Sequence, residues 1–243
     1  MTTARRVLVG MPGYTGLSGQ AAAGFYRCTS DPRLARLWMQ SGSLLAHNHN
    51  LLWCGALNGF EAGELTHFAC QHSDVEPEAG WLDVLLSEMD ATGLDVLGVP
   101  VPLKDERGLT STAVARADGD RWRVQRRLTL TEIHTLPETF TSEDVGGPLL
   151  LNTGLWVAKL GEWSRQCWFT INDGIAQDPQ GVWTALVEPE DWFFSRRLHE
   201  LGVKVGCTRK VRLAHRGPVP FTNSRPWGQA TDVDNEHTAE AAA

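Results

Sequence analysis

The sequence lacks a long apolar run. Its longest apolar stretches, such as residues 96–101 and 149–151, are far shorter than the roughly 20 residues that a transmembrane helix needs. An N-terminal targeting pattern is missing as well, because Arg5 and Arg6 are followed by only a few apolar residues before Pro12. These absences predict a cytoplasmic protein that has no membrane partner.

The five cysteines lack any paired pattern, since no two of them form a Cys-x-x-Cys motif. An odd and dispersed set argues against both a disulfide framework and a structural zinc site. The positions are Cys28, Cys54, Cys70, Cys167 and Cys207. We expect most of them to be small buried residues in a reducing compartment.

Positive charge is scarce overall, and the net charge of −7 opposes a general nucleic-acid-binding surface. Residues 201–231 nevertheless hold six basic residues and no acid, namely Lys204, Arg209, Lys210, Arg212, Arg216 and Arg225. A second cluster, offset by two aspartates, holds Arg116, Arg121, Arg123, Arg126 and Arg127. Either cluster could contact phosphates, and either could equally be a solvated face.

What the sequence does contain is an alternation of strand-like and helix-like segments. The predicted strands cover residues 6–10, 34–40, 65–71 and 94–101, and the predicted helices cover residues 18–28, 43–57 and 81–89. Ser41 or Ser43 would cap the second helix, and Gly93 would end the third. This alternation predicts an α/β fold whose mainly parallel sheet has helices on both faces.

The second half of the chain is less regular and predicts a small antiparallel part. Short strands are expected at residues 124–130, 149–152, 155–158, 203–206 and 211–214, and a helix at residues 191–201. A chain of 243 residues favours one sizeable domain over two small ones. We expect that single domain at residues 1–230, with a first half at about 1–103, a second half at about 104–230 and a flexible tail at 231–243.

Two polar segments follow predicted strands and should meet in space. A turn at residues 11–16 follows the first strand, and an acidic cluster at residues 72–78 follows the third. In a parallel sheet, ligands bind beyond the carboxyl ends of the strands. Pro12, Gly13 and Asp74 are therefore expected to line one cleft.

Four short segments occur in a characteristic order: Val9-Gly10-Met11-Pro12, the segment from Leu65 to Asp74, Asn152-Thr153-Gly154, and Glu190-Asp191-Trp192 with His215 further on. This order resembles the inverting GT-A glycosyltransferases of family 2, over roughly residues 7–217, and implies a nucleotide-binding half at about 1–103 and an acceptor half at about 104–230. The resemblance implies a GT-A-like, Rossmann-like fold that transfers a sugar, with inversion, from a nucleotide-sugar donor to an acceptor hydroxyl. A UDP-sugar is the favoured donor, and the implied cofactor is a divalent metal, manganese before magnesium.

By this resemblance, Asp74 is the second acid of an Asp-x-Asp type metal motif, which reads His72-Ser73-Asp74 here. A cation bound there would neutralise the diphosphate of the leaving nucleotide. His72 replaces the first acid; it could ligate manganese, which tolerates imidazole better than magnesium does, or contact the ribose or a phosphate. His215 matches a late histidine that serves as a second ligand. The alternatives are a helix cap for Asp74 and an ordinary surface position for His215.

Asp191 is the candidate general base, again by resemblance, with Glu190 as the alternative one residue earlier. Inverting transfer needs a carboxylate that takes the proton of the acceptor hydroxyl. The start of a helix favours the ionised form of such a carboxylate. Because aspartate also caps helices well, a purely structural cap is the competing interpretation.

Further contacts follow from the resemblance alone. The implied donor-binding residues are Pro12, Gly13, Tyr14, Asn50, His72, Ser73 and Asp74. His49 stands where the family carries an arginine before that asparagine. The residues expected to line the donor sugar and the acceptor are Asn152, Thr153, Gly154, Trp156 and Trp192. Glycine allows close backbone approach and an indole can stack on a sugar ring, although Trp156 could equally belong to the core.

The acceptor and the reaction class leave alternatives open. The acid-free stretch beside His215 suggests an anionic acceptor, such as an acidic glycan or a hydroxymethylated DNA base, and a small hydroxyl compound is a further candidate. A nucleotidyltransferase would share the nucleotide-binding half, but Pro12 to Gly16 lacks the basic residue expected in its glycine-rich turn. A catalytically inactive carbohydrate-binding protein is a further alternative, because His72 replaces the first acid of the metal motif. Other catalytic templates, including G-x-G-x-x-G and H-E-x-x-H, are absent.

Overall fold

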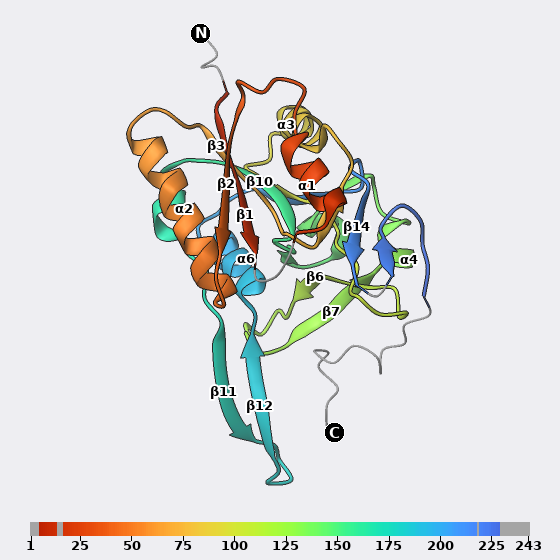
Figure 1. Cartoon of the computed structure of the whole chain (residues 1–243). Helices are drawn as coiled ribbons and strands as arrows, with labels where there is room; N and C mark the ends of the chain where they lie inside the picture. The colour runs from red at the N-terminus through yellow and green to blue at the C-terminus, as the bar shows by residue number, and fades with distance from the viewer. Residues whose placement is uncertain (1–4, 14–16, 218, 229–243) are drawn as a thin grey trace.

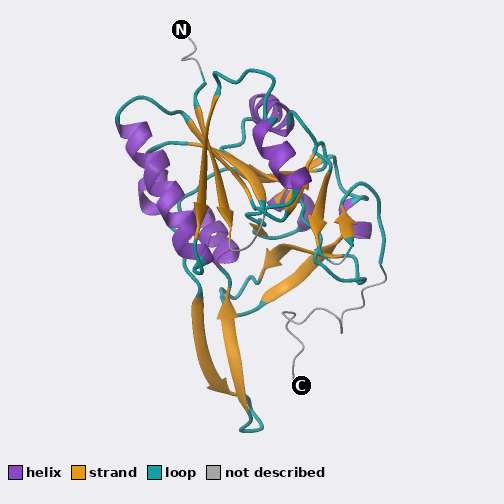
Figure 2. Ribbon diagram, in the orientation of Figure 1, coloured by secondary structure: helices purple, strands orange, loops and turns teal. Residues whose placement is uncertain are grey.

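The computed structural model describes residues 5–13, 17–217 and 219–228. The fold is mixed α/β, with a central sheet between layers of helices (Figures 1 and 2). Among the described residues, none of the helices combines the length and the apolar character that crossing a bilayer requires. The predicted tail at residues 231–243 lies outside the described residues.

The main sheet has seven strands, of which β10 and β8 run opposite to the other five. Their order is β2 (Ala35–Ser41), β1 (Val7–Gly13), β3 (His67–Gln71), β10 (Leu155–Lys159), β5 (Val96–Gly98), β13 (Val205–Thr208) and β8 (Thr139–Thr141). The predicted mainly parallel sheet is confirmed. Strands from both halves of the chain share it, because β10 lies between β3 and β5.

Helices cover both faces of this sheet, as the continuous burial of β1 requires, because successive side chains of a strand point to opposite faces. Val7 and Val9 pack with α1 (Gly19–Tyr26) and α3 (Trp81–Thr92), whereas Leu8 packs on the opposite face with α2 (Leu45–Glu61) and α6 (Glu190–Glu200). Gly93 ends α3 in a left-handed conformation, as predicted. The predicted serine cap of α2 is wrong, because Leu44 is its N-cap and gives no side-chain hydrogen bond.

Three smaller antiparallel sheets complete the fold. They are β7-β6-β9 (Val124–Thr129, Leu109–Ala115 and Leu149–Leu150), β15-β14-β4 (Pro220–Thr222, Leu213–Arg216 and Val75–Pro77) and β11-β12 (Asn172–Gln177 and Trp183–Glu188). The β11-β12 hairpin projects from the body of the molecule (Figure 1). The short helices are α4 (Leu130–Ile133), α5 (Ser142–Val145) and the 3-10 turn at Glu162–Gln166. Among the strands, sequence patterns missed β4, β6, β8, β11, β12 and β15.

Candidate functional site

The carboxyl ends of β1 and β3 meet at one edge of the main sheet. A side chain built on Gly13 would place its Cβ 3.2 Å from Ser73 Oγ, so the two segments touch. Asn48 of α2 reinforces this edge by donating to the carbonyl oxygens of Gly13, at 3.3 Å, and Gly42, at 2.9 Å. The predicted meeting of the first turn with the His72–Asp74 segment is confirmed at Gly13 and Ser73. Pro12 is buried in β1, and Tyr14 lies outside the described residues.

Asp74 and His215 are brought together across 140 positions of sequence by the pairing of β4 with β14. The Arg216 backbone N–H donates to the Asp74 carbonyl oxygen at 2.8 Å, and His215 lies opposite Val75. His215 Nε2 consequently lies 3.4 Å from Asp74 Oδ2. His215 Nδ1 donates to the Pro102 carbonyl oxygen at 2.7 Å, so this bond turns Nε2 towards the carboxylate.

Lys104 is a functional candidate that sequence reasoning missed. Its ammonium group forms an ion pair with the same Asp74 oxygen that faces His215. Burial alone would raise the pKa of Asp74, but hydrogen bonds from His215 and Lys104 hold it well below its usual range. Asp74 is therefore an ionised carboxylate that already interacts with positive charge.

The Asp74 and His215 pair fits a divalent cation. Two ligand bonds of about 2.1 Å at a right angle place the ligand atoms about 3.0 Å apart, close to the 3.4 Å observed. The carbonyl bond to Nδ1 is the usual partner of a histidine that ligates metal through Nε2. To bind a cation there, Asp74 would exchange the Lys104 ammonium for it.

His72 contacts a second histidine, and its assignment as a third ligand of the cation held by Asp74 and His215 stays a prediction. Its Nε2 lies 2.9 Å from Nε2 of His49, inside the layer between β3 and α2. Burial lowers the pKa of His72 to about 4 and that of His49 well below its usual range, so both rings are neutral near pH 7. His49 and His72, the two residues at which the sequence departs from the family pattern, therefore contact each other.

The Asn152–Gly154 segment connects the Asp74 region with Asp191. The Gly154 carbonyl oxygen accepts from the His72 N–H at 2.8 Å, and the Gly154 N–H donates to Asn152 Oδ1 at 2.7 Å. Asn152 Nδ2 donates to Ser111 Oγ and reaches Asp191 Oδ2 at 3.5 Å. Thr153 between them is buried. The predicted order of segments thus corresponds to one continuous set of contacts.

Asp191 lies in the first turn of α6, not at its cap, because Pro189 is the N-cap and gives no side-chain bond. Its Oδ1 accepts from the Trp192 N–H at 2.8 Å. Burial, and then the charge of Glu190, raise the pKa of Asp191 well above its usual range, and burial also raises the pKa of Glu190. A carboxylate whose pKa is raised in this way is a stronger base than an exposed carboxylate.

Two assignments are corrected by burial, those of Trp156 and Trp192 as sugar contacts. Trp156 is 1% exposed and packs in the core against Trp53, Phe68 and Phe194, so it offers no face to a sugar. Trp192 is also 1% exposed, and its Nε1 donates to the Ser111 carbonyl oxygen at 2.9 Å.

Asn50 is likewise engaged inside the protein. Its Nδ2 donates to the Phe169 carbonyl oxygen at 2.7 Å, and its Oδ1 accepts from the Phe169 N–H at 2.8 Å. These two bonds fix the chain before the β11-β12 hairpin. The structure thus gives Asn50 a structural role in place of the predicted donor contact.

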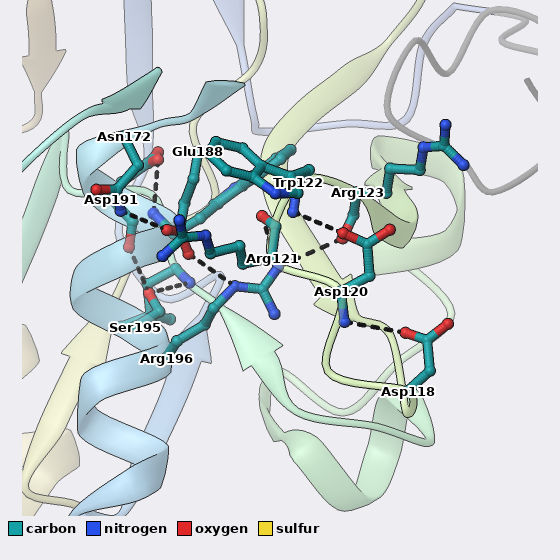
Figure 3. A network of polar contacts seen from close by, with 12 residues as sticks. Asp118, Asp120, Arg121, Trp122, Arg123, Asn172, Glu188, Asp191, Ser195 and Arg196 are labelled. Carbon is teal, nitrogen blue, oxygen red and sulfur yellow. Dashed lines mark hydrogen bonds and ion pairs between the residues drawn. The ribbon is translucent and has the colours of Figure 1, made fainter. Parts of the chain in front are cut away.

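A buried ion pair holds the hairpin root beside Asp191 (Figure 3). Arg196 of α6 pairs with Glu188 at 3.1 Å, and Asn172 Nδ2 donates to the same carboxylate at 2.7 Å. Arg196 also donates to the carbonyl oxygens of Arg121 and Arg123 at 3.4 Å. The network joins β11, β12, α6 and the loop before β7, so it fixes the chain that leads into Glu190 and Asp191.

Replacing Glu188 by alanine should therefore destabilise the protein by about 3–5 kcal/mol, because Arg196 would keep a buried charge without its partner. Chemical denaturation would measure the loss. Arg165→Ala, which removes an exposed pair with Glu61, is the matched control and should change stability little. Equal effects of the two substitutions would contradict this role for the network.

The acid-free stretch is partly neutralised by acids from elsewhere in the fold. Lys210 pairs with Glu88, and Arg216 pairs with Glu76 at 2.9 Å. Arg225, together with Glu106, Phe221 and Trp227, lines a cavity of about 220 Å³. The excess of positive charge near His215 is thus smaller than the sequence predicts.

No protein-family model matches the chain, and no curated protein sequence matches it. Among solved structures, A197 from STIV aligns over 98% of this chain and 98% of its own, with 16% identity and a TM-score of 0.49. An Entamoeba histolytica protein described as a "putative UDP-N-acetylglucosamine pyrophosphorylase" aligns over 73% of this chain and 51% of its own, with 14% identity and a TM-score of 0.35. Both similarities are too distant to carry an argument about activity, so the site must carry it.

Proposed function

We propose that this chain is a metal-dependent glycosyltransferase of the GT-A type, which moves a sugar from a nucleotide-sugar donor to an acceptor hydroxyl with inversion. One observation carries the proposal. Asp74 and His215, oriented as a cation site, are connected through Asn152 to a buried carboxylate, Asp191, whose pKa is raised. A charged site for a leaving diphosphate beside a strong base is what inverting transfer needs.

In the donor half, Asp74 and His215 would hold manganese or magnesium, which supplies charge stabilisation for the departing diphosphate. Lys104 is positioned to contribute a second positive charge to the same phosphates once Asp74 no longer pairs with it. The backbone around Gly13 and Ser73 would contact the nucleotide, of which UDP is the favoured form. Glycine at position 13 leaves that approach open.

In the acceptor half, Asp191 would take the proton from the attacking hydroxyl. Asn152 contacts the Asp191 carboxylate and orients it, while Glu190 raises its basicity. The acceptor is proposed to be a glycan, a small hydroxyl compound or a modified DNA base. The anionic choices rest on Arg212 and Arg225, whose side chains form no hydrogen bond or ion pair with the residues that the structure describes.

If Asp191 is the general base, the rate of sugar transfer should depend on pH. Because Asp191 must be ionised, turnover should rise with pH through its raised pKa, well above the usual aspartate range of about 4. Glu190→Gln removes a neighbouring negative charge, so it should move this rise to lower pH. A rate that is flat down to pH 4 in the wild type, or an unmoved profile in Glu190→Gln, would count against Asp191 as the base.

The proposal is tested by incubating the protein with UDP-sugars and manganese and identifying the nucleotide product. Release of UDP, with an inverted sugar product, supports glycosyl transfer. Formation of UTP when pyrophosphate is added would instead identify the alternative, a nucleotidyltransferase. Binding without any turnover would identify an inactive carbohydrate-binding protein.

A further inference from the structure

Three side chains with metal-ligand chemistry meet between β3 and α2, and neither Asp74 nor His215 is among them. Cys70 lies near the end of β3, His72 follows two residues later, and His49 extends from α2. One nitrogen of each imidazole and the Cys70 sulfur all lie within 4.8 Å of one another. In the part of the chain that the structure describes, this is the one group of three or more histidines, cysteines and acids that comes so close.

The contact between the two histidines leaves a polar atom unsatisfied. His49 is fully buried, and its Nε2 faces His72 Nε2 at 2.9 Å. Its other nitrogen, Nδ1, has no hydrogen-bond partner among the described residues. Whichever nitrogen carries the proton, a buried polar atom without a partner costs about 1–3 kcal/mol. A cation bound between the two facing Nε2 atoms would use their lone pairs, because a neutral imidazole binds metal through its unprotonated nitrogen, and the proton of His49 would stay on Nδ1.

We propose that His49, Cys70 and His72 bind one zinc ion. Two imidazoles and a thiolate form a ligand set that zinc prefers, whereas manganese and magnesium favour oxygen ligands. Two Zn–N bonds of about 2.0–2.1 Å at the tetrahedral angle place the nitrogens about 3.3 Å apart, so the observed 2.9 Å requires only a small ring movement. Binding would release the Cys70 thiol proton to solvent and leave a fourth position for water on the side of half-buried His72.

Such an ion would join α2 to the end of β3. The turn that follows directly carries Asp74, and it is closed by the Val75 N–H, which donates to the His72 carbonyl oxygen at 3.1 Å. Zinc would thereby fix the position of Asp74 without touching its ligands. The site is distinct from the proposed manganese site in residues and in metal chemistry, so it does not depend on the proposed glycosyltransferase activity.

Metal analysis of the purified full chain tests the proposal. We expect about one zinc ion per chain, and a thiolate-to-metal absorption band when cobalt(II) replaces it. Cys70→Ser and His49→Gln should each lose the bound zinc, and Cys70→Ser should lose the cobalt band. Cys207→Ser, which changes another fully buried cysteine of the main sheet, should retain both, and Asp74→Asn should retain zinc.

Two results would overturn the zinc site. One is a wild-type chain that carries no zinc and develops no thiolate band with cobalt(II), a result that does not depend on any variant folding. The other is zinc that persists in Cys70→Ser and His49→Gln, or that disappears in Asp74→Asn, because the ion would then lie elsewhere. Loss of stability on chelation in the wild type, absent in Cys70→Ser, would support it independently.

Discussion

Replacing Asp191 by asparagine should lower the rate of sugar transfer about a hundredfold or more while making the protein more stable. The rate falls because general-base catalysis contributes about that much, and an amide cannot accept the proton. Stability rises because burial and Glu190 disfavour the ionised form of Asp191 in the folded state, as the raised pKa shows. We expect a gain of about 1 kcal/mol, or about 2–4 °C in Tm for a chain of this size.

The gain should depend on pH in a defined direction. A carboxyl whose pKa is raised by folding opposes folding increasingly as the pH rises from its unfolded value, about 3.9, through its folded value. The advantage of Asp191→Asn should therefore be full near neutrality and should vanish as the pH falls below 4. Thermal denaturation at several pH values, combined with steady-state kinetics, measures both effects.

Asp83 provides the matched control, since it also lies in the first turn of a helix. Despite some burial, the hydrogen bonds that Asp83 accepts from Thr29, at 2.5 Å, and Ser30, at 2.7 Å, lower its pKa. Asp83→Asn should consequently lose stability and keep full activity. If Asp191→Asn were instead active and Glu190→Gln inactive, the base would be Glu190.

The second large effect is expected from Asp74→Asn, which should abolish metal-dependent transfer while leaving the fold intact. A neutral amide is a much poorer ligand for a hard cation than a carboxylate, and it also loses its charge interaction with Lys104 and His215. Activity measured across a manganese titration would show the loss. Near wild-type turnover at limiting manganese would contradict the assignment of Asp74.

Two companion variants sharpen this test. Glu78→Gln removes an exposed carboxylate of the same acidic segment and should leave transfer unchanged. Lys104→Gln removes the ammonium group that competes for Asp74, so half-maximal activity should need less manganese. If the wild type worked without metal and Lys104→Gln were inactive, Lys104 would be neutralising the diphosphate in place of a cation.

The sequence predicts the first half of the fold well because short apolar strands and longer helical segments leave distinct patterns. The predicted strands and helices up to Gly98 correspond to observed elements, although β4 was missed, and the glycine at the end of α3 is recognisable by its chemistry. The hairpin β11-β12 could not be predicted in this way. Its exposed positions include apolar residues, namely Ile175 on β11 and Trp183 and Val187 on β12, so inward and outward positions do not alternate in polarity.

At the site, the order of motifs in the sequence predicted that Asp74, Asn152 and Asp191 belong to one functional site. The contact of Asn152 with the Asp191 carboxylate is consistent with that prediction. Lys104 could not be found, because only the fold places its loop against Asp74. The cluster at His49, Cys70 and His72 was missed for a similar reason. Its members have no metal-motif spacing in the sequence, and the pairing of α2 with β3 alone brings them together.

The most direct measurement of the central claim is the change in Tm that nucleotide sugars produce with and without manganese. A ligand bound only by the native state at 100 times its Kd adds about 2.7 kcal/mol of stability. We predict such a shift for a UDP-sugar with manganese, a much smaller one when either is omitted, and none in Asp74→Asn. Wild-type protein that responds to no nucleotide sugar in the presence of manganese, or a shift that survives in Asp74→Asn, would contradict the proposed donor site.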